Sequence, residues 1–416
     1  MTAGLPQRAS VRRDQAMAGL AVACGWAVYL PLGSQYLVYL LLAAMALASL
    51  RQPGHLRALR QWPPLVPLCA LWVLLVLSAL WSTAAPEDRW SHAWHYGRLL
   101  FMPLIAMVCT ANAGKRGLRH FIAASAVVAV LTILEHFGLL PTSPIWHSTT
   151  DANGNQRIAT SLLLALGVVL ALIEVFDARQ PHRRRLVWLM AVLVIALALT
   201  LQDRRTGMVA LPALLALLAV SWQRGRRHAA WRSSGLLLAV IALSALTWQQ
   251  SATVQARFNE GLNELRTYQS TGVVATSWGM RLRMAETTLD MVREQPLLGH
   301  GLGSWVSQWR PRAAGGGPVL ERQLTPHMEY LLIAEQAGLV GLGLWLWFLA
   351  ACFRTSWQAG HAGDAALMVW LAVAWSGLFN VVVRDAKFAL PLLMLAALAT
   401  AAARISADPE SASTGR

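Results

Sequence analysis

The chain has 416 residues, of which 56% are hydrophobic and only 13% are charged, and its formal net charge is +15. Soluble globular domains carry about 25% charged residues, so this composition excludes an ordinary soluble protein and indicates a polytopic membrane protein. The basic residues are scattered between apolar segments, which argues against nucleic-acid binding. The four cysteines lie inside apolar runs without metal-ligand spacing, so we expect neither a cysteine metal site nor a disulfide framework.

Apolar runs predict an all-α protein with about twelve transmembrane helices. A basic tail, 1–15, precedes the first run without a convincing cleavage site after it, so we expect a retained first span. Nine spans are expected within 16–250 and three within 327–404. A long polar segment, 251–326, here called the insert, separates them, and a polar tail, 405–416, follows. The predicted spans are 16–32, 34–50, 63–81, 96–112, 120–138, 157–176, 186–201, 206–222, 234–250, 327–353, 364–383 and 388–404.

The distribution of cations predicts an orientation. Every even-numbered loop is basic, as in the run Arg183-Arg184-Arg185 after the sixth span, which places these loops and both termini in the cytoplasm. The insert then faces outward. Several cations on the outer side break this rule, namely Arg157, Arg204, Arg205, Arg384 and Lys387. A single outer cation commonly snorkels to the headgroups, whereas five on one side favour an anion-binding site.

The insert is predicted to contain two helices, 251–267 and 278–294. The second is amphipathic, with apolar residues at three- and four-residue spacing. Pro296 ends it, and the glycine-rich stretch 299–303 is expected to form a turn. This stretch is a poor phosphate loop, because it lacks the Lys-Ser/Thr pair and no strand precedes it. The insert ends before His327, where a long apolar run begins.

No nucleotide-binding, zinc or serine-hydrolase motif is present, and no outer loop holds an Asp-x-Asp pair for a divalent metal. We therefore expect outer-face chemistry without metal or cofactor, carried by arginine and histidine. Taken singly, His327 is more often an interfacial polar residue and Arg281 a solvated helix arginine, so the residues alone leave both roles open. Glu335 is expected to link helices rather than to act as an acid.

Three motifs follow one another on the predicted outer side. Arg204-Arg205-Thr206-Gly207 lies at the mouth of the eighth span. The second begins at Arg281 and ends with the stretch 296–303, and the third, His-Met-Glu-Tyr-Leu at 327–331, opens the tenth span. In this order they resemble the O-antigen ligase family of the WaaL type, which is grouped with O-antigen polymerases and bacterial protein O-oligosaccharyltransferases.

The resemblance holds residue by residue with two departures. Arg205 matches the functional arginine of the family's Ser-Arg-small-Gly motif, although Arg204 replaces the serine. Arg281 matches the arginine of the outer helix that precedes Pro-Leu-x-Gly-x-Gly-x-Gly. His327 matches the histidine of His-Asn-x-x-Leu, although Met328 replaces the asparagine and removes any side-chain amide role there.

The resemblance implies a GT-C-type membrane fold and transfer of a glycan from undecaprenyl diphosphate. For a ligase, the acceptor is a sugar hydroxyl of lipid A–core at the periplasmic face of the bacterial inner membrane, in lipopolysaccharide biosynthesis. Arg205 and Arg281 would bind the diphosphate, and neutral His327 would take the acceptor proton in an inverting, metal-independent transfer. Further candidates for substrate binding are Arg157, Arg204, Arg384 and Lys387.

Two alternatives remain open. An O-antigen polymerase or a protein O-oligosaccharyltransferase would differ only in the acceptor, and the short tail after residue 404 favours the ligase between them. A transporter of a lipid-linked anion would instead need charged residues along a path through the bilayer and discontinuous helices. The cations gather at the outer mouth, which favours chemistry at the surface over translocation.

Overall fold

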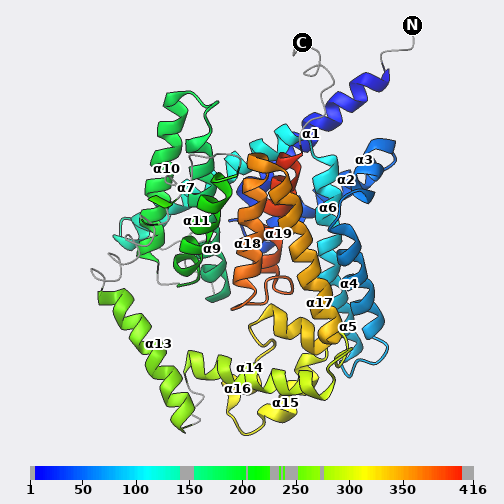
Figure 1. Ribbon diagram of the computed structural model, residues 1–416, viewed down its shortest axis with the longest axis vertical. Coiled ribbons are helices and arrows are strands. Elements are labelled where there is room, and N and C mark those ends of the chain that lie inside the picture. Colours follow the sequence, from blue (N-terminus) through cyan, green and yellow to red (C-terminus); the bar gives the residue numbers. More distant parts are fainter. Residues whose placement is uncertain are drawn as a thin grey trace.

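The structure is a computed structural model that describes residues 5–140, 154–202, 205–224, 234–235, 238, 252–271 and 276–404. The described residues form helices and turns without a strand, which confirms the predicted all-α fold. Most of the long helices run side by side as a bundle, and the elements of the insert lie across its lower end (Figure 1).

The helices before the insert are α1 (Leu5–Ala27), α2 (Leu32–Ser49), α3 (Pro53–Arg60), α4 (Leu65–Ser78), α5 (Pro86–Gly97), the 3-10 turn η1 (Arg98–Leu100), α6 (Phe101–Val108), α7 (Ala111–His136), α9 (Gly154–Phe176), α10 (His182–Leu201) and α11 (Arg205–Trp222). The insert contains α13 (Ala252–Thr271), α14 (Ser277–Glu294), α15 (Trp305–Ala313) and α16 (Pro318–Glu321). The last elements are α17 (Glu329–Gln358), the 3-10 turn η3 (Gly360–Gly363), α18 (Asp364–Ser376) and α19 (Ala386–Ala403). Both helices predicted for the insert therefore form.

The centre of the bundle is built on α19 and α9. Other parts of the protein bury 83% of the apolar window of α19 and 72% of that of α9, but only 17% of that of α10. α19 packs against α7, α6 and α18, and α9 packs against α10, α11 and α7. A helix that is apolar all round and enclosed by others forms the core of a bundle, whereas α10 presents most of its apolar surface outward, as a lipid-facing helix does.

Six described helices are long and apolar enough to cross a membrane, or up to seven if the bent pair α3–α4 counts as one span. The expected count of about twelve is not confirmed. The predicted span 96–112 is divided among the end of α5, η1 and the eight-residue α6, because Thr110 caps a new helix by accepting a hydrogen bond from the Ala113 N–H. The predicted span 364–383 contains only the 13-residue α18, and the span 234–250 lies almost entirely outside the described residues.

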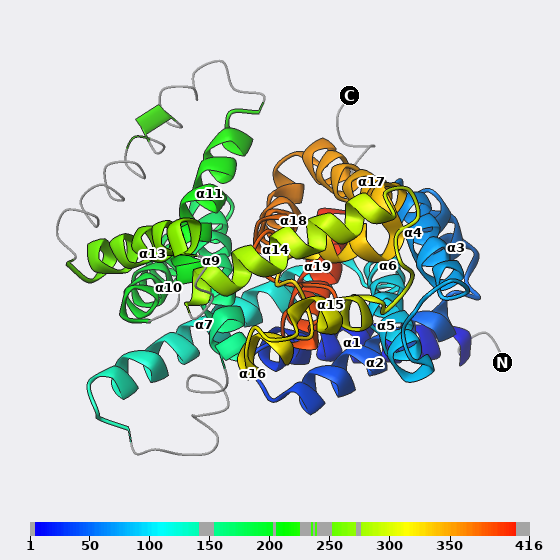
Figure 2. The ribbon, with the colours of Figure 1, turned by 90° about the horizontal axis from the view of Figure 1, so that it is seen from below.

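The insert covers one end of the bundle. α14 begins after Thr276, whose side chain accepts a hydrogen bond from the Gly279 N–H, and it packs on α17 and α15. Its apolar face buries Met284 and Met291 in a small core with Trp305 and Trp309, whose rings stack at 5.1 Å. Seen from below, α14 crosses the end of the bundle over α18 and α19 (Figure 2). The start of α1 and the end of α19 lie at the opposite end (Figure 1).

α17 is broken at Gly338, which has φ 65° and ψ −168°, a conformation almost restricted to glycine. The break leaves backbone groups without helical partners, and residues 296–301 of the insert supply them. The N–H of Leu339 donates to the carbonyl of Pro296 at 2.8 Å, and the N–H of His300 donates to the carbonyl of Glu335 at 2.8 Å. The insert is therefore joined to α17 through main-chain hydrogen bonds at the break.

Candidate active site

His327 lies in the short non-helical link between the insert and α17. Its φ is +54°, and among the described residues it is the one non-glycine residue with a positive φ. Such a conformation is held by the surroundings and is enriched at functional sites. The imidazole Nε2 lies 3.2 Å from the Gln323 side-chain oxygen, so the neighbouring turn of the insert orients the ring.

The charges around His327 show that three elements meet there. Burial, followed by the charge of the nearby Arg281 guanidinium, lowers the pKa of His327 to about 4, and the Asp385 carboxylate partly opposes both effects. Arg281 comes from α14 and Asp385 from the turn before α19. The structure thus brings together Arg281 and His327, which are far apart in sequence, and keeps the imidazole neutral near pH 7.

The first arginine motif lies at the start of α11. Gly207 donates its N–H to the Ser161 hydroxyl at 2.9 Å, and a Cβ at Gly207 would lie 2.1 Å from the Ser161 carbonyl oxygen. The glycine is therefore required for the close approach of α11 to α9. Arg157 is half-buried one turn before Ser161. Arg205 is the first residue of α11, but its side chain and the whole of Arg204 lie outside the described residues.

The start of α11 lies at the same end of the bundle as His327. At its other end, Arg224 forms an ion pair with Asp364, the first residue of α18, and stacks on the Trp357 ring at 4.3 Å. α18 then runs toward the turn that carries Asp385. α11 and α18 pack against each other and are therefore antiparallel, so the start of α11 and the end of α18 share one end of the bundle. The end of α18 lies beside the His327 link, because the Glu329 N–H donates to the Gly377 carbonyl at 2.8 Å.

The turn before α19 holds the remaining candidates. Arg384 and Lys387 are both half-buried, and Asp385 between them accepts a hydrogen bond from the Lys387 N–H at 3.0 Å, which caps α19. The Arg384 Nε donates to Nε2 of His92 at 2.9 Å. Of this turn, Asp385 is the residue whose charge acts on His327, and Arg384 and Lys387 flank it in the chain.

Buried ionisable residues that sequence reasoning missed hold this turn in place. Arg98, with 0% exposure, donates to the carbonyl oxygens of Val383 and Arg384, each at 3.0 Å. Glu329, also at 0%, accepts hydrogen bonds from the Tyr96 hydroxyl at 3.0 Å and the Val383 N–H at 2.9 Å. An ionisable residue within an apolar run indicates a functional site. The position of Arg98 in the predicted span 96–112 could therefore have identified it from the sequence.

The glycine-rich stretch is a structural junction. The N–H groups of Gly299, His300 and Gly301 donate to main-chain carbonyls, and that of Gly303 donates to the Gln336 side chain. They are therefore not available to a phosphate, and the predicted turn is confirmed. Positive φ angles at the three glycines, together with contacts that would block a Cβ at 299 and 301, explain their spacing.

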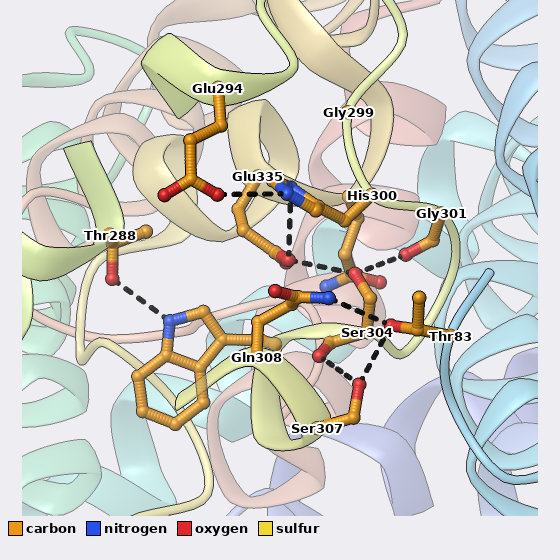
Figure 3. Close-up of polar contacts among 12 residues, drawn as sticks. Thr83, Thr288, Glu294, Gly299, His300, Gly301, Ser304, Ser307, Gln308 and Glu335 are labelled. Atoms are coloured by element: carbon orange, nitrogen blue, oxygen red, sulfur yellow. Dashed lines mark hydrogen bonds and ion pairs between the residues drawn. The ribbon is translucent and has the colours of Figure 1, made fainter. Parts of the chain in front are cut away.

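A buried polar cluster completes this junction (Figure 3). Glu335 accepts a hydrogen bond from the Ser304 hydroxyl at 2.7 Å, so it links α17 to the insert. His300 lies between two carboxylates, with Nε2 3.6 Å from Glu294 and Nδ1 3.8 Å from Glu335. In the described part of the chain, no group of three His, Cys, Asp or Glu side chains could hold a metal ion.

Comparison with known proteins adds two findings. Residues 190–346 match the protein-family model described as O-Antigen ligase. An uncharacterized protein of Haemophilus influenzae is 22% identical over 252 residues, which cover 58% of this chain and 60% of that protein. The chain thus matches only about three fifths of this relative's length. The range of the family match includes Arg205, Arg281, His327 and the junction at Gly338.

Proposed function

We propose that the chain acts as an O-antigen ligase, the family whose model residues 190–346 match, and transfers a glycan from undecaprenyl diphosphate to a sugar hydroxyl of lipid A–core. The transfer is inverting and needs no metal or cofactor. The protein is then a multi-pass enzyme of the bacterial inner membrane with a GT-C-type fold and about twelve spans. Both termini are cytoplasmic, and the insert and the site face the periplasm.

The observation that carries this proposal is the pairing of a neutral, half-buried imidazole with a guanidinium. Burial and the charge of Arg281 both hold the pKa of His327 down, to about 4, so the ring is a free base at neutral pH. A base must be deprotonated before it can accept a proton, and a diphosphate leaving group needs positive charge beside it. His327 and Arg281 meet these two requirements in one place.

In the proposed reaction, the acceptor hydroxyl attacks the anomeric carbon as His327 takes its proton. The new glycosidic bond forms while the sugar–phosphate bond breaks, and undecaprenyl diphosphate leaves with the bonding electrons. Arg281, with Arg205, stabilises the negative charge that develops on the diphosphate, since guanidinium groups bind phosphate oxygens in pairs. The Asp385 carboxylate favours the imidazolium that His327 becomes, because it raises the pKa of that ring.

The transporter alternative gains one observation, because α17 is a discontinuous helix. In transporters, the backbone groups freed by such a break bind the substrate or the coupling ion. Here residues 296–301 of the insert already bond the groups on both sides of Gly338. The break therefore supports the attachment of the insert and offers no ion site, which favours the transferase.

A reconstituted assay tests the proposal. Vesicles that contain the full-length protein, purified lipid-linked glycan and lipid A–core should form the ligated product in the presence of EDTA and without nucleotides. His327→Ala should abolish product, whereas His182→Ala, on the exposed start of α10, should not. Product that forms only on a glycan or a peptide acceptor would identify the polymerase or the protein O-oligosaccharyltransferase instead. Donor movement across the vesicle without product would identify a transporter.

A further inference from the structure

The Arg384 guanidinium is held from one side only. Its Nε donates to Nε2 of His92 at 2.9 Å. Its two terminal nitrogens make no hydrogen bond or ion pair among the described residues. Neither is among the buried polar atoms that lack a partner, so both are accessible. A half-buried guanidinium with free, accessible terminal donors has the two parallel N–H groups that bind phosphate oxygens.

The main chain beneath Arg384 is fixed. Arg98 binds the carbonyl oxygens of Val383 and Arg384, and Glu329 binds the Val383 N–H. Since Arg98, Glu329 and Val383 are buried, the Cα of Arg384 cannot shift without leaving charged or polar groups unpaired. The remaining freedom of the guanidinium lies in its own side-chain torsions.

His92 removes that freedom. It is only 3% exposed, and its Nε2 accepts from Arg384, so the ring proton must lie on Nδ1. Nδ1 donates to the Gln336 side-chain oxygen at 3.1 Å, and the same oxygen accepts the Gly303 N–H at 2.9 Å. Burial and the adjacent Arg384 charge lower the pKa of His92 to about 3, so the ring stays an acceptor at physiological pH.

We propose that His92 is a positioning residue that aims Arg384 at the diphosphate of the donor. A chain of hydrogen bonds then runs from the glycine-rich junction through Gln336 and His92 to the guanidinium. This inference rests on the proposed function, because it takes the anion to be a prenyl diphosphate. His92 itself does not touch the substrate.

Two substitutions of His92 distinguish the roles of its two ring nitrogens. The amide oxygen of Gln can replace Nε2 and accept from Arg384, whereas Asn can replace only Nδ1 and bond Gln336. Binding of farnesyl diphosphate to the purified full-length protein is the readout. His92→Asn should weaken binding about tenfold, the value of one charge-assisted hydrogen bond, and His92→Gln should change it less than about threefold.

A double-mutant cycle decides whether His92 acts through Arg384. In an Arg384→Ala background, His92→Asn should cause no further loss of farnesyl diphosphate binding. An equal loss with and without Arg384 would mean that His92 supports folding only, and would overturn the inference. If His92→Asn does not fold, Arg384→Lys replaces it: the variant keeps the charge without the Nε–H, and wild-type binding would again overturn the inference. Absence of binding by the wild-type protein would overturn the proposed donor class, and the role of His92 with it.

Discussion

Substitution of Gly338 by alanine should detach the insert from α17. The φ of 65° with ψ of −168° lies in a region that costs an L-residue about 1–3 kcal/mol. An added Cβ would also lie 2.0 Å from the Leu297 carbonyl oxygen and 2.5 Å from the Leu298 nitrogen. Neither atom can rotate away, because both belong to the main chain. The stretch 296–301 must therefore move as a whole.

The size of the effect follows from the hydrogen bonds at that contact. The N–H groups of Leu339 and Val340 donate to the carbonyls of Pro296 and Leu297, and each such bond contributes about 1 kcal/mol. Together with the backbone strain, the expected loss is about 3–5 kcal/mol in the free energy of unfolding. Transfer should fail as well, because the first part of α17 carries the link with His327.

Gly343→Ala is the matched control for this prediction. Gly343 lies in the same helix, has helical geometry and has no atom within 4 Å of an added Cβ, so alanine should be neutral or stabilise by up to about 1 kcal/mol. Thermal unfolding in detergent and the ligation assay should be measured on both variants. If the two variants unfold at the same temperature and transfer equally well, the break at Gly338 does not hold the insert in place.

Three further predictions concern the site. Activity should stay level over roughly pH 6–8 and fall only as the pH approaches 4, because a lowered pKa keeps the His327 base deprotonated; an acid limb centred near 6.5 in a pH–rate profile would contradict this. Arg281→Lys and Arg205→Lys should each lower kcat by about 100-fold, and full activity in both would exclude guanidinium-specific binding of the diphosphate. Gly207→Ala should separate α11 from Ser161 and raise KM for the donor, which steady-state kinetics can measure.

Local patterns predicted the helices of the insert well. The three- and four-residue spacing of apolar residues gave α14 almost to its ends, and the glycine-rich turn lies where Pro296 ends that helix. The number of spans was less predictable, because hydropathy does not show where one apolar helix ends and the next begins. Such a boundary lies at Thr110, which caps α7 directly after the short α6. The break of α17 at Gly338 could not be predicted from hydropathy either, because it depends on packing against Leu297, which is distant in sequence.

The site was predictable only in part. The motifs pointed to Arg281 and His327, and the structure brings these two residues together. It does not describe the side chain of Arg205. The residues that fix the surrounding turn, Arg98 and His92, were not identified as part of the site, because their role depends on contacts with a segment almost 300 positions later. Long-range polar contacts of this kind leave no periodic trace in a sequence.

The main-chain attachment of the insert to α17 constrains how the protein could open for the proposed lipid-linked donor. Lifting the insert away would break the four main-chain hydrogen bonds that join residues 296–301 to α17, at about 1 kcal/mol each. Hinge motion should therefore carry the insert and the first half of α17 as one rigid body. His327 and Arg281 would then move together, and lateral access for a prenyl chain would have to come from movement of helices outside this body.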